Sequence, residues 1–189
     1  MVPPRDNLQK YIRAGADMVI IRAGKGLRGP QGAGLLFGRK DLIHGASANC
    51  SPNQFLGRGM KVSKEEIIGF ITALEIFVSE DEDKETQQLH NKAQKIVDAL
   101  VEIPGITVAV QQDEHDFLTP TTTIRFDKSW RGRARNDILQ SLEHGNPPIY
   151  LQANFLPEDA VAVDPFNVDD DELDPLIKRL REELLRTVN

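Results

Sequence analysis

A glycine-dense segment between two short apolar runs constrains this chain more than any other feature. The apolar runs cover residues 18–21 and 35–37, and glycine fills five of the eleven positions from 24 to 34. Continuous apolar runs of this length are typical of strands buried on both faces of a parallel sheet. We therefore expect residues 1–47 to form part of a larger α/β sheet, with a glycine-rich loop between two strands.

The middle of the sequence predicts long helices. Ser63 and Glu66 have the spacing of a capping box. The helix they begin is apolar nearly all round over residues 67–78, so we expect it to be buried on most sides. A second helix follows and ends at Pro104. Residues 48–104 are thus interpreted as a connecting loop and long helices.

From residue 105 onward the pattern changes to short strands and amphipathic helices. The expected elements are strands at 106–111, 121–126, 149–151 and 160–163, a helix at 133–143 that ends at a left-handed Gly145, and a terminal helix at 170–188. This change favours a separate, small α+β domain at residues 105–189.

Charge is distributed unevenly along the 189 residues. The net charge is −6, yet residues 1–64 hold 11 lysines and arginines against 3 acidic residues. This asymmetry favours anion binding by the first third, although a chance distribution would look similar. Aromatic residues make up only 6%, too few for a nucleic-acid stacking platform. No apolar run approaches the roughly 18 residues of a membrane span.

The cysteine content and the start of the sequence favour a cytoplasmic protein. Residues 1–6 lack the apolar core of a signal peptide. Cys50 is the single cysteine, which excludes an internal disulfide and a cysteine-based zinc site. The four histidines share no metal-ligand spacing, so no metal site is expected.

Lys25, within the glycine-dense segment, is the candidate catalytic residue. A dinucleotide fingerprint needs a helix directly after its glycines, which Pro30 prevents, and a Walker A loop needs Ser or Thr where Gly26 stands. Gly24 and Gly26 would let a flat ligand approach the Lys25 backbone. A lysine in a partly dry site can lose its proton and attack a carbonyl. The alternative is a surface hairpin with a solvated lysine.

Two further cations are candidates for binding anions. Arg58 and Lys61 lie in an irregular segment and could bind a cofactor phosphate or an anionic substrate. The alternative is that both are solvated surface residues.

Several segments together resemble one branch of the fold-type I pyridoxal-phosphate (PLP) enzymes. The segments are residues 15–31, 35–43, 51–58, 60–62, 64–67, 72–75 and 145–150. They are similar to selenocysteine synthase (L-seryl-tRNA selenium transferase) and to D-glucosaminate-6-phosphate ammonia-lyase-like proteins. The resemblance implies the C-terminal part of this α/β fold: a partial large-domain sheet, a long linking helix and a small α+β domain.

The resemblance also implies roles for individual residues. Lys25 stands where the family's lysine forms the Schiff base with PLP, and Arg22 stands where a phosphate-binding serine is common. Gln152 stands where the family often has an arginine, which is a candidate ligand for the substrate anion. The implied reaction is β-elimination or group transfer on a small anionic amino acid or amino sugar acid, with lysine moving the Cα proton.

The family's remaining cofactor-binding elements are expected upstream of Met1. We therefore expect the 189 residues alone to bind PLP weakly and to be inactive or incomplete as an enzyme. A non-catalytic truncated paralogue or dimerising remnant is the alternative, and a nucleotide-binding module is a weaker one. An unpaired sheet edge and apolar helix faces favour a homo-oligomer, with no membrane or nucleic-acid partner.

Overall fold

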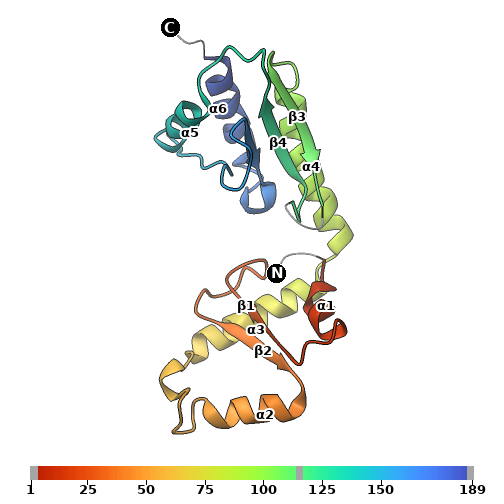
Figure 1. Ribbon diagram of the computed structural model, residues 1–189, viewed down its shortest axis with the longest axis vertical. Coiled ribbons are helices and arrows are strands. Elements are labelled where there is room, and N and C mark those ends of the chain that lie inside the picture. Colours follow the sequence, from red (N-terminus) through yellow and green to blue (C-terminus); the bar gives the residue numbers. More distant parts are fainter. Residues whose placement is uncertain (1–3, 114–116, 187–189) are drawn as a thin grey trace. The chain divides into compact units, whose positions relative to one another are not determined.

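The computed structural model describes residues 4–113 and 117–186, which divide between two compact units, Met1–Glu82 and Asp83–Asn189 (Figure 1). The first unit contains α1 (Asn7–Arg13), β1 (Met18–Arg22), β2 (Gly34–Gly38), α2 (Lys40–Asn49), the 3-10 helix η1 (Arg58–Met60) and α3 (Lys64–Ser79). The second contains β3 (Ile106–Gln111), β4 (Thr121–Phe126), α5 (Arg135–Glu143), β5 (Ala160–Val163), the 3-10 helix η2 (Pro165–Asn167) and α6 (Leu173–Leu185). Helix α4 (Glu82–Leu100) starts at the boundary. Among the described residues, no helix has the length and apolar character needed to span a bilayer.

The strands of the first unit form an antiparallel hairpin, with Ile20 opposite Leu36. The expectation of parallel strands buried on both faces is wrong for this pair, because parallel strands need a long crossover and the connecting loop supplies none. Ile21 is buried in a cluster with Phe70 and Phe77 of α3. The opposite face of the hairpin is open, and Ile20 is 72% exposed.

Helix α3 confirms the capping box but not the expected burial. The Ser63 hydroxyl accepts from the Glu66 amide at 3.2 Å, and the Glu66 carboxylate accepts from the Ser63 amide at 3.3 Å. Only Phe70 and Phe77 of the helix are buried, because the two-stranded hairpin covers a single side. Five apolar residues of α3 are exposed: Ile67, Ile68, Ile71, Ile76 and Val78.

The second unit is built on the antiparallel sheet β3-β4-β5, separate from the first hairpin. The strands expected at 106–111 and 121–126 are confirmed, whereas 149–151 is not a strand, and pairing with β5 comes instead from Gln152 bridging Ala162. Gly145 is absent from the positive-φ residues, so its left-handed conformation was also predicted wrongly.

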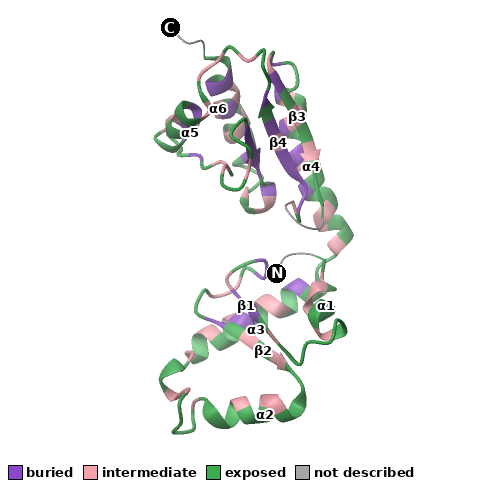
Figure 2. Cartoon of the chain, in the orientation of Figure 1, coloured by how far each residue is buried: buried purple, intermediate pink, exposed green. Residues whose placement is uncertain are grey.

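One face of this sheet packs against α4, α5 and α6, and β4 is coloured as mostly buried in Figure 2. The core residues are Ile96, Leu100, Ile103, Ile106, Ile124, Phe126, Ile138, Leu142, Ile149, Val161, Val163, Leu173, Leu180 and Leu184. The alternation of β3 and β4 follows from this arrangement, since every second residue points into the core.

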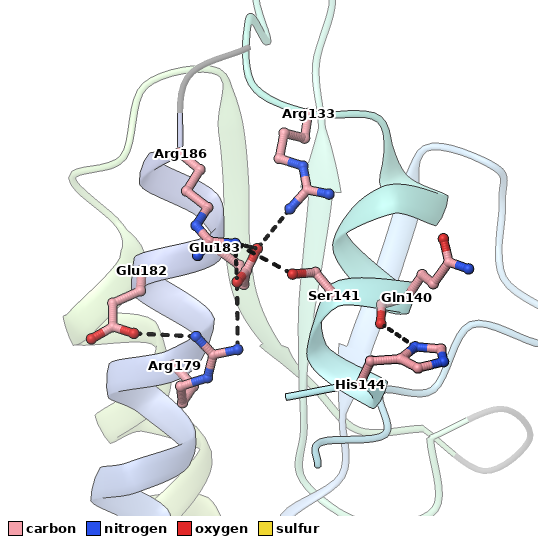
Figure 3. Close-up of polar contacts among 8 residues, drawn as sticks. All are labelled: Arg133, Gln140, Ser141, His144, Arg179, Glu182, Glu183 and Arg186. Carbon is pink, nitrogen blue, oxygen red and sulfur yellow. Dashed lines mark hydrogen bonds and ion pairs between the residues drawn. The ribbon is translucent and has the colours of Figure 1, made fainter. Parts of the chain in front are cut away.

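A buried carboxylate fastens α6 to its surroundings in the second unit (Figure 3). Glu183 is fully buried and accepts from Arg133 at 2.9 Å, while Arg186 lies 2.9 Å and Arg179 3.5 Å from its other oxygen. Arg133 precedes α5, so this contact ties the loop before α5 to α6. Burying a carboxylate costs desolvation free energy unless cationic partners surround it. The three guanidiniums supply this compensation for Glu183.

We expect Glu183→Gln to lower the free energy of unfolding by about 3 kcal/mol, because three guanidiniums then lose their shared counter-charge. The measurement is urea unfolding followed by circular dichroism. Glu182→Gln is the matched control: Glu182 is 47% exposed and, among the described residues, pairs with Arg179 alone, so its loss should cost under about 1 kcal/mol. Equal effects of the two substitutions would show that Glu183 is not the fastening point.

Candidate functional site

Lys25 lies in the loop that connects β1 to β2. The loop is closed at its base by the Ala23 amide, which donates to the Ala33 carbonyl at 3.0 Å. Within it, the Arg28 amide donates to the Lys25 carbonyl at 2.8 Å, and the Gly29 amide donates to the Ala23 carbonyl at 2.9 Å. Arg28 has a φ of 53°, so the chain makes a tight turn directly after Lys25.

The loop is held in place by packing against α3. Ala23, Leu27 and Ala33 are buried and belong to the same cluster as the helix residues. The approach is close, since a Cβ added to Gly29 would lie 3.1 Å from the Ala73 methyl. A Cβ added to Gly69 of α3 would lie 2.8 Å from a ring carbon of Pro30. Small residues on both sides therefore let the helix support the loop that carries Lys25.

The Lys25 side chain points away from this support. It is exposed, and none of the described residues makes a hydrogen bond or ion pair with its amino group. Arg22, at the end of β1, is likewise exposed and unpaired within the described part of the chain. Within the described residues of the first unit, Lys25 therefore lies at an exposed position of the hairpin loop.

Gly24 has a structural explanation that the sequence did not reveal. The Gln31 side-chain amide donates to the Gly24 carbonyl at 3.0 Å, and a Cβ on Gly24 would overlap the same amide group. A Cβ at this position would displace the exposed Gln31 side chain from its hydrogen bond. The partners lie seven positions apart in an irregular loop, and no sequence periodicity signals such a contact.

The other candidate residues lie in different parts of the structure. Arg58, in η1, has a long contact of 3.4 Å to the Ser51 hydroxyl, and its Nε is buried without a partner among the described residues. Lys61 is exposed just after η1. Gln152 belongs to the second unit, where its backbone pairs with Ala162 through bonds of 2.9 and 2.8 Å and its side chain is exposed.

Arg39 cannot serve as a free anion ligand, although it contributes to the positive charge of this region. Its guanidinium contacts Asp41 at 2.6 Å and Asp17 at 2.9 Å. The hydrogen bond from Arg39 lowers the pKa of Asp41 below its usual value, and the two carboxylates raise the pKa of Arg39. The cations left for an anionic ligand in this unit therefore include Arg22, Lys25 and Lys61.

The loop fits covalent attachment of an aldehyde cofactor in its chemistry. A primary amine can attack the carbonyl only if the amine is accessible and not engaged elsewhere, and the Lys25 side chain meets both conditions. Arg22 adds a guanidinium suited to a phosphate group. Among the described residues, no group of three or more histidine, cysteine or acidic side chains could hold a metal ion.

Comparison with known proteins identifies this fold. The chain is 29% identical to the D-glucosaminate-6-phosphate ammonia lyase of Salmonella typhimurium over 177 residues, which is 94% of this chain and 46% of that protein. It is 28% identical to a 5'-C-glycyluridine monooxygenase-decarboxylase of a Streptomyces species over 178 residues, 94% of this chain and 44% of that one. The chain thus spans about half the length of the curated relatives it matches. No protein-family model matches it.

Solved structures agree with these relatives. A structure of D-glucosaminate-6-phosphate ammonia-lyase superposes with a TM-score of 0.74 at 28% identity, covering 97% of this chain and 47% of that one. A C-DES mutant with glycine covalently linked to its PLP cofactor gives a TM-score of 0.51 at 18% identity, covering 92% and 48%. The chain has the fold of about half of a fold-type I PLP-dependent enzyme. The expected fold class is thereby confirmed, as is the kinship with D-glucosaminate-6-phosphate ammonia-lyase. The narrower likeness to selenocysteine synthase stays a prediction.

Proposed function

We propose that this chain is the C-terminal part of a PLP-dependent lyase or transferase, with Lys25 as the lysine that holds the cofactor covalently. The observation that carries the proposal is the Lys25 loop itself. Its backbone is fastened to α3, while its amino group is accessible and unpaired among the described residues. A rigid loop with a free amine is what covalent attachment requires.

Each candidate residue has a role in this proposal. PLP, when bound, supplies an electron sink for the bond that breaks at the substrate Cα. Lys25 Nζ holds the cofactor and then removes or returns the Cα proton as general base and acid. Arg22 binds the phosphate, with Gly24 keeping the adjacent backbone clear. Arg58 and Lys61 attract the anionic substrate, and Gln152 offers it an uncharged amide.

The names of the relatives suggest a substrate class. Glucosaminate 6-phosphate is an amino acid whose own carbon chain is that of a sugar acid, and glycyluridine carries a glycyl group on the sugar of a nucleoside. We extend this to the present chain and propose a sugar-like amino acid as substrate, with β-elimination as the reaction. Group transfer of the selenium-transferase kind is the second possibility from the sequence resemblance.

The 189 residues by themselves should bind the cofactor weakly. The matched stretch is less than half of each relative, so this proposal assigns part of the cofactor site to residues outside it. The exposure of Lys25 agrees with this, because no described residue shields its amine from water. A non-catalytic paralogue or remnant is the alternative, and the exposed apolar residues of α3 favour it because they suit an assembly role.

We expect PLP to react with Lys25 at millimolar cofactor, giving the near-visible absorbance of a lysine imine and no release of ammonia from a sugar-like amino acid. Lys25→Ala should abolish most of this absorbance. Lys40→Ala is the matched control, since Lys40 is also exposed and lies at the start of α2. Equal loss in both variants would contradict the role of Lys25. Ammonia release by the wild-type chain would contradict its inactivity.

Self-association is a further expectation for the first unit. Ile67, Ile71 and Val78 are exposed, lie four and seven residues apart along α3, and form an apolar stripe beside the buried one. An exposed stripe of this kind favours a homo-oligomer. Light scattering at micromolar concentration should show an assembly, and Ile71→Lys should dissociate it. Thr72→Lys, which adds a charge at an exposed position of the same helix away from this stripe, is the control. A monomeric wild-type chain would contradict the proposal.

A further inference from the structure

The second unit has a pocket on the sheet face that its helices leave open. The pocket has a volume of about 410 Å³. Its floor is formed by the outward residues of β3 and β4, where Ala109 lies opposite Thr123 and Thr107 lies opposite Arg125. Because alanine and threonine are short, the face is hollow rather than filled. None of the described residues that line the pocket is acidic.

One wall of the pocket is the short segment at residues 155–157, which is held in place by hydrogen bonds to backbone groups that flank it. Arg135, at the start of α5, donates to the Ala153 carbonyl at 2.7 Å and to the Ala160 carbonyl at 2.8 Å. The Ala160 amide donates to the Pro157 carbonyl at 3.0 Å. These bonds use backbone groups on both sides of the segment and hold the wall in place.

Arg125 is the one arginine of the second unit that the described residues leave unpaired. The unit has seven arginines, and the other six all make hydrogen bonds. No hydrogen bond or ion pair connects Arg125 with any described residue. Its guanidinium is therefore available to bind a ligand anion in the pocket, which is also lined by Thr107, the residue opposite Arg125 in the strand register.

The pocket also presents apolar surface near this charge. Phe155 has a φ of 65° and a fully exposed ring, and Leu156 beside it is half-buried. A left-handed backbone is energetically unfavourable for a phenylalanine. The exposed ring makes no packing contacts with the described residues that would offset this cost. A ligand that covers the ring would remove apolar surface from water, and the free energy gained would offset the cost of the backbone conformation.

We propose that this pocket binds a small monocarboxylate with an apolar body, such as an aryl-substituted carboxylic acid. One guanidinium matches a single negative charge, whereas a phosphate carrying nearly two would be left partly uncompensated. Residues 155–157 and Phe117 cover the apolar body. The proposal is independent of the function proposed for Lys25, because every lining residue belongs to the second unit and Gln152 is not among them.

The test is an amide NMR titration of the full chain with 3-phenylpropionate. We expect chemical-shift changes concentrated at Thr107, Ala109 and Thr123. Binding should be at least about tenfold weaker for 3-phenylpropionamide, which lacks the charge, and for propionate, which lacks the apolar body. Shifts dispersed over the surface, or equal binding of all three compounds, would overturn the proposal.

Variants separate the site from general charge effects. Arg125→Gln should weaken 3-phenylpropionate binding at least about tenfold, whereas Lys128→Gln, which removes one exposed charge outside the pocket, should change it less than about twofold. Ala109→Phe places a ring in the hollow and should abolish binding while the circular dichroism stays unchanged, because Ala109 is exposed. Unaltered binding in Arg125→Gln or Ala109→Phe would overturn the proposal. Lys25→Ala should leave this binding unaffected, so the two proposals fail separately.

Discussion

The packing of the glycine-rich loop on α3 determines where Lys25 can act. Leu27, only two residues after Lys25, is 4% exposed, and burying a leucine side chain contributes about 1.5–3 kcal/mol. That contact, with the buried Ala23 and Ala33 at the two ends of the loop, leaves the lysine little backbone freedom. Of the loop glycines, Gly29 lies against Ala73 and Gly32 against the Glu66 side chain, so both allow a close approach between the loop and α3.

The two units differ in how completely they bury their apolar residues. The second unit has one continuous core between its sheet and three helices, with Glu183 joining the parts at one side. The first unit buries a smaller cluster and leaves Ile20 and Ile68 of its hairpin and helix exposed. A unit of this kind gains stability when another surface covers it. This difference is consistent with a chain that spans half of its relatives' length.

Local sequence signals predicted the second unit well, because its strands alternate and its helices are amphipathic. The boundaries at 106–111 and 121–126 agree with β3 and β4. The first unit was harder, since short apolar runs such as residues 18–21 do not reveal strand direction, and an apolar helix does not reveal how many neighbours it has. Contacts between distant residues, such as Gln31 with Gly24 and Glu183 with Arg133, leave no periodic signal at all.

The role of Lys25 was suggested by family resemblance rather than by residue spacing. Spacing alone left a surface hairpin and a reactive lysine both open, and the structure shows a hairpin whose lysine is accessible. Arg125 was missed because a single arginine in an alternating strand looks like any solvated position. Two structural observations single it out. The strand register places it opposite Thr107, and the other six arginines of the unit all make hydrogen bonds whereas Arg125 makes none to any described residue.

Borohydride reduction of the chain in the presence of PLP, followed by peptide mass mapping, tests the central claim most directly. Reduction makes the bond between the cofactor and a lysine permanent, so the labelled residue is identified without any need for turnover. The account predicts that the label is found mainly on the peptide containing Lys25 at limiting PLP. A label spread over Lys40, Lys61 and Lys64, with Lys25 no more reactive than these exposed lysines, would contradict it.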